Sequence, residues 1–192
     1  MTIRITSAFD SGNIQVTESG GDAASLTIRH DAHSDFYQWF HFRVSGAGGR
    51  PVTLALTNCA TSAYPGGWPD YSARVSEDRE SWRLADTSYA DGVLTIRHQP
   101  AGDSFWLAYF APYDFERHQR LVARMAAQPG VFWSSPGTSL DGREIDVLTV
   151  GEGHLQVWLY ARQHPGETMA EWWMEGALEK LLDGADPVAR RL

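Results

Sequence analysis

Cysteine is almost absent from this sequence of 192 residues, in which Cys59 is the only one. An intrachain disulfide and a zinc cluster built from thiolates are therefore excluded. Long apolar runs are missing too: no stretch approaches the ~20 apolar residues of a membrane span, and the N-terminus has no apolar region of signal-peptide length. We therefore expect a cytoplasmic protein without a membrane partner.

An excess of positive charge is also missing, because 16 Lys and Arg stand against 24 Asp and Glu, giving a net charge of −8. Binding to phosphate backbones needs a basic face, so we expect no nucleic-acid partner. Large apolar side chains, by contrast, are plentiful, with eight Trp, eight Phe and seven Tyr in a sequence that is 43% hydrophobic. This composition is that of a folded chain with a sizeable core.

The first part of the chain, up to about residue 112, consists of short runs in which apolar and polar residues alternate. Such alternation is the period of half-buried strands. Turn-forming residues separate the runs, as in the glycine-rich stretch 46–49 and at Asp91 and Gly92. Many short strands with no helical period among them predict an antiparallel β-sandwich, which we expect over residues 1–118.

The pattern changes after residue 112, where runs at helical and at strand spacing follow one another. The expected elements are a helix over 113–128, strands over 144–150 and 155–161, and a helix over 168–182. Thr168 and Glu171 are spaced as a capping box for the last helix. The order is that of the opening of an α/β domain. Some 70 residues are too few to complete such a domain, so this part is either a small two-stranded appendage or a piece of a longer protein. We interpret residues 119–192 as the incomplete beginning of the domain.

The best candidate for chemistry is the pair His164 and Glu167, three residues apart on a predicted turn between strand and helix. Imidazole nitrogen and carboxylate oxygen are both good zinc ligands. Open α/β sheets also place their ligands beyond the carboxyl ends of strands, which is where this turn falls. The spacing alone, however, favours a surface histidine beside a glutamate at a helix start, because acidic residues are frequent here.

The surrounding sequence carries more information than the spacing. Residues 162–168, Arg-Gln-His-Pro-Gly-Glu-Thr, continue into Met-Ala-Glu-Trp-Trp and resemble the zinc-ligand segment of the cytosolic carboxypeptidases in the metallocarboxypeptidase superfamily. Residues 137–148 resemble the segment that precedes the ligand strand in bacterial members. Residues 36–42 and 108–113 are similar to the β-sandwich domain that precedes the catalytic domain in that family. The resemblance implies a β-sandwich followed by the first strands and helix of a carboxypeptidase-like α/β/α domain.

By this resemblance His164 and Glu167 are the first two ligands of a Zn²⁺ ion. The family takes its third ligand, a second histidine, from further downstream, and no histidine follows His164 here. The general base and the arginine that binds the substrate carboxylate are likewise expected outside this chain, so no catalytic residue is assigned. Arg162 is interpreted as structural, and the other histidines as ordinary surface or strand residues. The chain alone is expected to be inactive and to need the missing C-terminal half of the domain as its partner.

The implied activity is hydrolysis of C-terminal amino acids from peptides or proteins. Some members of the family trim acidic residues such as glutamate, but a net charge of −8 would repel acidic tails unless a basic pocket lies downstream. The alternative is a non-catalytic β-sandwich module that binds peptide or carbohydrate. Its binding platform would be formed by aromatic residues of one loop-rich stretch, although packing over the sandwich edge is the favoured interpretation of these residues: Tyr64, Trp68, Tyr71 and Trp82.

Overall fold

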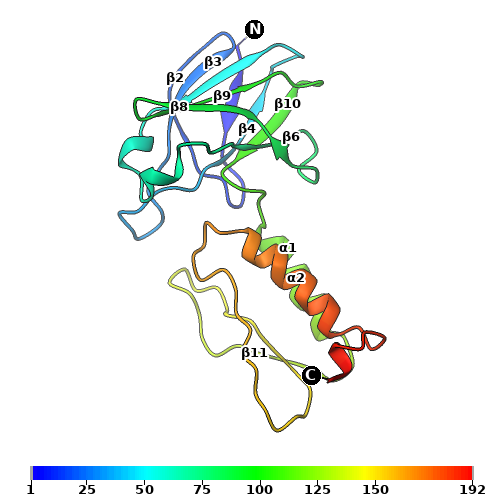
Figure 1. Cartoon of the computed structure of the whole chain (residues 1–192). Coiled ribbons are helices and arrows are strands. Elements are labelled where there is room, and N and C mark those ends of the chain that lie inside the picture. The colour runs from blue at the N-terminus through cyan, green and yellow to red at the C-terminus, as the bar shows by residue number, and fades with distance from the viewer. Residues whose placement is uncertain (1, 192) are drawn as a thin grey trace. The chain divides into compact units, whose positions relative to one another are not determined.

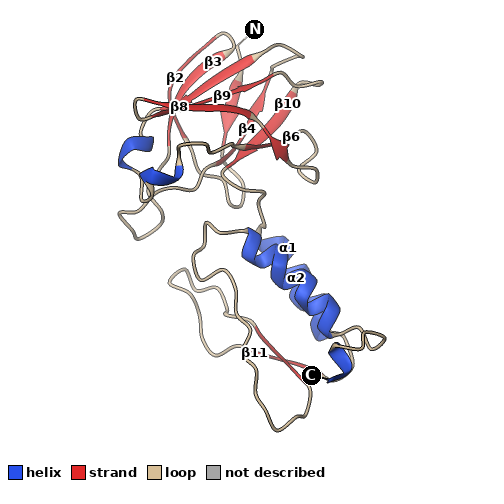
Figure 2. Cartoon of the chain, in the orientation of Figure 1, coloured by secondary structure: helices blue, strands red, loops and turns tan. Residues whose placement is uncertain are grey.

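The computed structural model describes residues 2–191 and divides the chain into two compact units, one ending at Pro112 and the other beginning at Tyr113 (Figure 1). The strands of both sandwich sheets lie in the first unit, whereas the two α-helices lie in the second (Figure 2). Among the described residues, no helix has the length and apolar character needed to cross a membrane.

The first unit contains two five-stranded sheets, in agreement with the predicted β-sandwich. One sheet has the order β1 (Arg4–Thr6), β4 (His41–Ser45), β10 (Ser104–Ala108), β6 (Arg74–Ser76), β7 (Arg83–Leu84). The other has the order β2 (Gln15–Gly20), β3 (Ala23–Thr27), β5 (Val52–Leu56), β9 (Val93–His98), β8 (Asp86–Ala90). Neighbouring strands are antiparallel except β3 and β5, which run parallel. Two short 3₁₀ helices, Cys59–Thr61 and Pro65–Gly67, lie between β5 and β6.

The core of this unit follows from the alternation in its strands. In β5, Leu54 and Leu56 are buried, whereas Thr53 between Val52 and Leu54 is exposed. Leu54 pairs with Ile96 and Leu56 with Leu94 of β9, so the apolar faces of the two strands coincide. Burial of each such side chain stabilises the folded state by about 1.5–3 kcal/mol. A one-residue slip would expose the whole set, and the register is fixed accordingly.

Two of the aromatic residues that could have formed a binding platform, Trp68 and Tyr71, instead pack into this core. Trp68 is completely buried, and its Nε1 donates to the Cys59 carbonyl at 3.0 Å and to Ser62 Oγ at 2.8 Å. The rings of Tyr71 and Tyr109 lie 5.3 and 5.5 Å from it in edge-to-face geometry. Among the four candidate rings of that stretch, only one is exposed: Tyr64. The packing interpretation is therefore confirmed for Trp68 and Tyr71.

The turn that joins β8 to β9 requires glycine. Gly92 has a φ of +82°, and a Cβ atom there would lie 2.8 Å from Ala60 Cβ. We expect Gly92→Ala to lower the free energy of unfolding by about 1–2 kcal/mol, because left-handed backbone is costly for other residues. Urea denaturation measures the change. Gly20→Ala in β2 is the control, since nothing lies within 4 Å of its added Cβ and its φ is not positive, and equal effects would contradict the prediction.

The second unit consists of two helices and a two-stranded sheet. Its elements are α1 (Phe115–Ala126), β11 (Val131–Ser134), β12 (Val147–Val150), α2 (Met169–Leu181) and a 3₁₀ helix (Ala189–Arg191). Both predicted helices are therefore present. Asp114 caps α1 by accepting the Arg117 amide at 2.8 Å. Tyr113, Leu121 and Met125 are buried and form the small core with Trp172 of α2.

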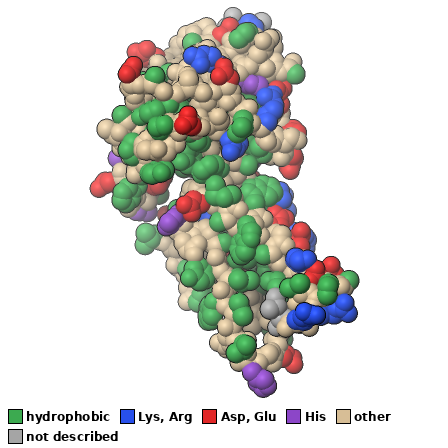
Figure 3. Space-filling view, in the orientation of Figure 1, with side chains coloured by type: hydrophobic (Ala, Val, Ile, Leu, Met, Phe, Trp, Pro, Cys, Tyr) green, Lys and Arg blue, Asp and Glu red, His purple; other side chains and the backbone are tan. Residues whose placement is uncertain are grey.

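The predicted strand over 155–161 is wrong, because these residues form no strand. A strand needs a neighbour for its backbone hydrogen bonds, and within residues 2–191 no strand pairs with this segment. Its apolar side chains are exposed instead, including Leu155 at 89% and Trp158 at 76%. Hydrophobic side chains are visible on the surface of this unit in Figure 3.

Candidate metal centre

His164 and Glu167 lie on the turn that leads into α2, and their side chains converge. His164 Nδ1 is 3.3 Å from Glu167 Oε1. The Glu167 amide donates to the His164 carbonyl at 3.0 Å, which closes the turn. The two side chains are 78% and 55% exposed. The structure thus brings the two predicted ligands together on an open surface.

The geometry of this pair fits a zinc ion. Two donors that share a tetrahedral zinc, each about 2.0–2.1 Å away, are about 3.3–3.4 Å apart. The separation of 3.3 Å in this chain matches that value, and the imidazole and carboxylate are of the right chemical kind. Within residues 2–191, however, no group of three or more His, Cys, Asp or Glu side chains is arranged so that it could hold a metal ion. The described residues therefore offer two candidate metal ligands at this turn, His164 and Glu167.

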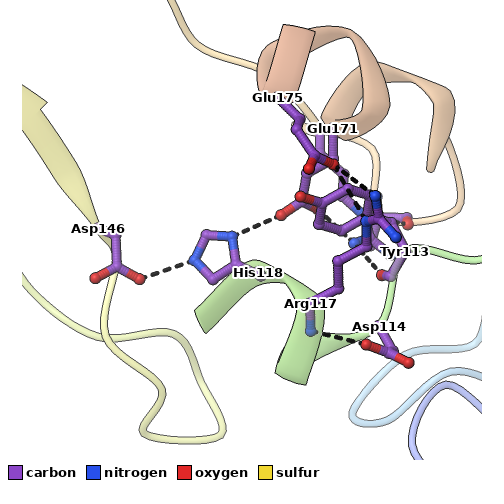
Figure 4. A network of polar contacts seen from close by, with 9 residues as sticks. Tyr113, Asp114, Arg117, His118, Asp146, Glu171 and Glu175 are labelled. Atoms are coloured by element: carbon purple, nitrogen blue, oxygen red, sulfur yellow. Dashed lines mark hydrogen bonds and ion pairs between the residues drawn. The ribbon is translucent and has the colours of Figure 1, made fainter. Parts of the chain in front are cut away.

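A second feature of this unit, which sequence analysis missed, is a chain of polar contacts through His118 (Figure 4). His118 of α1 was expected to be an ordinary surface residue, and that expectation is wrong. Its Nδ1 lies 2.6 Å from Glu171 Oε1 and its Nε2 lies 2.8 Å from Asp146 Oδ2. The side chains of the two carboxylates are only 12% and 7% exposed. The imidazole thus joins α1, α2 and the loop before β12.

The electrostatics of this cluster favour a charged imidazole between two carboxylates. The hydrogen bond to Glu171 raises the pKa of His118 above its ordinary value and outweighs burial, and Asp146 acts in the same direction. Burial alone would raise the pKa of Glu171, but the hydrogen bonds from His118 and Arg162 outweigh it and the net shift is downward. Both ring nitrogens then donate.

The predicted capping box is also wrong, because Glu171 is engaged elsewhere. Thr168 makes no side-chain capping bond at the start of α2. Instead, Glu171 Oε2 accepts from Arg162 Nη1 at 2.5 Å. A buried carboxylate gains more from a guanidinium and an imidazolium than from a backbone amide at a helix end.

Arg162 folds back over the turn that carries the two candidate ligands. Its Nε donates to the Pro165 carbonyl at 3.0 Å, and its Nη1 donates to the Tyr113 carbonyl at 2.8 Å. Its backbone has a φ of +58°, which is uncommon for a residue other than glycine. The interpretation of Arg162 as structural agrees with these contacts.

A separate group of ion pairs joins the two helices further along. Glu175 of α2 accepts from Arg117 Nε and Nη2, each at 3.1 Å, and from Arg124 Nη2 at 3.0 Å. Arg124 also donates to Glu179 at 2.7 Å. These contacts link α1 to α2 without touching the turn at 162–168.

Comparison with known proteins decides the family. The family profile described as "Cytosolic carboxypeptidase N-terminal domain" matches residues 5–110, which is most of the first unit. The chain belongs to the cytosolic carboxypeptidase family. The resemblance noted in the sequence is thereby confirmed.

Relatives of this family member cover both of its units. An uncharacterised protein of Zymomonas mobilis is 57% identical over all 192 residues. Cytosolic carboxypeptidase 1 of Gallus gallus is 25% identical over 239 residues, covering 99% of this chain. The solved structure of a metallo-carboxypeptidase from Pseudomonas aeruginosa, in complex with (2-guanidinoethylmercapto)succinic acid, is 40% identical over 98% of this chain with a TM-score of 0.92. The fold is therefore that of the metallo-carboxypeptidases.

The chain spans only part of the length of these relatives. It covers 50% of the Zymomonas protein, 19% of the Gallus protein and 52% of the Pseudomonas chain. Relatives of this cytosolic carboxypeptidase family member thus contain a region to which nothing here corresponds.

Proposed function

We propose that this chain is the N-terminal portion of a zinc metallocarboxypeptidase that removes C-terminal amino acids from peptides or proteins. Residues 1–118 would be its sandwich domain and residues 119–192 the beginning of its catalytic domain. The observation that carries the proposal is the convergence of His164 Nδ1 and Glu167 Oε1 at 3.3 Å in a member of this family. The cytoplasm is the proposed location, because the relatives are called cytosolic.

The role of this chain in the reaction is to hold the metal. His164 would supply a neutral nitrogen and Glu167 a charged oxygen, leaving further positions for a downstream ligand and for water. Zinc, when bound, polarises water and the scissile carbonyl. The general base and the arginine for the substrate carboxylate are proposed to lie in the downstream half, so we expect no activity from this chain alone. A preference for acidic tails would need a basic pocket in that half to offset the net charge of −8.

The partner that completes the domain would cover segment 155–160. This segment exposes Val157 at 72% and Tyr160 at 71%, in addition to Leu155 and Trp158. Apolar side chains exposed in a contiguous group mark a surface that another element covers. We propose that the downstream half of the domain pairs with this segment as a strand.

The proposal is tested by zinc binding. In calorimetric titrations we expect His164→Ala to weaken zinc binding more than about tenfold, because even the loss of outer partners of a ligand costs about 10–100-fold. His154→Ala is the matched control, since His154 is exposed and lies outside the turn. Equal affinities of the two variants would overturn the assignment of His164.

A complementation experiment tests the proposed partner. The downstream half of the Pseudomonas relative, added to this chain, should tighten zinc binding and yield carboxypeptidase activity that His164→Ala abolishes. If that half leaves the zinc affinity unchanged, the hypothesis that this chain is part of a zinc carboxypeptidase loses its support. The sandwich is not favoured as a separate sugar- or peptide-binding module, because three of the four rings expected to form its platform are not exposed.

A further inference from the structure

The candidate ligand turn is held in an unfavourable backbone conformation. Arg162, two residues before His164, has a φ of +58°. Residues other than glycine keep such a conformation only where the surrounding structure enforces it, and such sites cluster where function needs a fixed geometry. The side chains of His164 and Glu167 are exposed, so they do not anchor the turn by packing.

The Arg162 guanidinium supplies the anchor. Its Nε binds the carbonyl of Pro165, which lies between the two candidate ligands in the sequence. Its Nη1 binds the Tyr113 carbonyl and Glu171 Oε2. One planar group therefore joins the inside of the turn to the residues just before α1 and to the first turn of α2.

Glu171 in turn fixes the guanidinium. Its carboxylate is 12% exposed and divides its oxygens between Arg162 and His118, while the other ring nitrogen of His118 is held by Asp146. Because both oxygens are engaged, the carboxylate has little freedom to rotate. The position of Arg162 thus depends on three separate elements of the unit.

Glu175 of the same helix is the comparison for Glu171, because its ion pairs only join the two helices. It lies one turn further along α2 and binds Arg117 and Arg124 of α1. Its side chain is 16% exposed, close to the 12% of Glu171. It differs from Glu171 in that its hydrogen bonds go to α1 and not to the turn at 162–168. A variant at Glu175 therefore separates docking of the helices from positioning of the ligands.

We propose that Glu171 is a positioning residue for His164 and Glu167, acting through Arg162. This inference rests on the proposed function, because it takes metal binding as the role of the turn. The contacts of Glu171 and Arg162 do not depend on that function. Glu171 would orient the two donors before any metal arrives.

Amide hydrogen exchange tests the positioning without metal. In Glu171→Gln we expect the Glu167 amide, which closes the turn, to exchange about tenfold faster or more, because a charge-assisted contact to Arg162 is lost. In Glu175→Gln we expect the helices to loosen while this amide exchanges as in the wild type. Equal acceleration in both variants, or in neither, would overturn the inference.

A double-mutant cycle shows whether Glu171 acts through Arg162. Arg162→Gln should accelerate exchange of the same amide, and the double variant should add little to either single change, since residues in one network are not additive. Arg162→Gln also serves if Glu171→Gln does not fold, because it leaves the contact between Glu171 and His118 intact. Additive effects would show that Glu171 stabilises the turn by another route.

Zinc titration then tests whether positioning of the turn by Glu171 affects the zinc affinity. We expect Glu171→Gln to weaken zinc binding about 10–100-fold relative to Glu175→Gln, as the loss of an outer partner does. If the two variants bind zinc equally while His164→Ala binds it weakly, the inference is wrong and the proposed function stands. If His164→Ala binds zinc like the wild type, the proposed function is wrong, and the exchange rates alone decide whether Glu171 holds the turn.

Discussion

Replacement of Trp68 by alanine is expected to lower the free energy of unfolding of the first unit by about 3–5 kcal/mol. The side chain is completely buried beside Tyr71 and Tyr109. Its removal leaves a cavity, because the structure around a deleted core side chain relaxes only partially. The Cys59 carbonyl and the Ser62 hydroxyl also lose the indole donor. Urea denaturation followed by near-ultraviolet circular dichroism measures the change.

Trp158→Ala is the matched control for this prediction. It removes the same side chain from a position that is 76% exposed, so we expect a change within about 0.5 kcal/mol. A loss in Trp68→Ala as small as that in the control would show that the loop around Trp68 is not part of the sandwich core.

Replacement of His118 by alanine is expected to destabilise the second unit by about 2–4 kcal/mol. The imidazole separates Glu171 and Asp146, and its loss leaves two little-exposed carboxylates without their shared donor. Arg162 still neutralises Glu171, which places the effect below that of an isolated buried charge. Hydrogen exchange of the α1 and α2 amides resolves this unit from the sandwich.

This stabilisation should depend on pH in a defined direction. The folded-state pKa of His118 is raised above 6.5, so its contribution is complete below that pH and is lost as the pH rises through the folded value. The folded-state pKa of Glu171 is lowered from 4.5, so its contribution is complete above that pH and is lost on acidification through the folded value. The difference in stability between wild type and His118→Ala should therefore be largest between about pH 4.5 and 6.5. A stability difference that grows from pH 6.5 to pH 9 would contradict the interpretation of His118 as a charged imidazole between two carboxylates.

The sandwich was predictable because its strands are half-buried, and half-burial leaves a period of two in the sequence. Leu54 and Leu56 of β5 are an example. The partners of each strand were not predictable in the same way. The parallel pairing of Ala24 with Leu54 depends on the path of the chain between β3 and β5, and no local pattern records it.

The candidate site was predictable where it is local and not where it is distant. His164 and Glu167 are three residues apart and meet on one turn. His118 and Glu171 are 53 residues apart, so neither spacing nor composition signals their contact. That contact also explains the error at the start of α2, since the spacing of Thr168 and Glu171 suits a capping box only when the glutamate has no stronger partner.

The exposed segment 155–160 also bears on the tendency of the chain to aggregate. Its residues, Leu-Gln-Val-Trp-Leu-Tyr, carry no charge and no proline, favour extended backbone and present their side chains to water. These are the properties of segments that stack with copies of themselves into aggregates. A downstream half that covered this segment, as proposed, would therefore also keep neighbouring molecules apart and in solution.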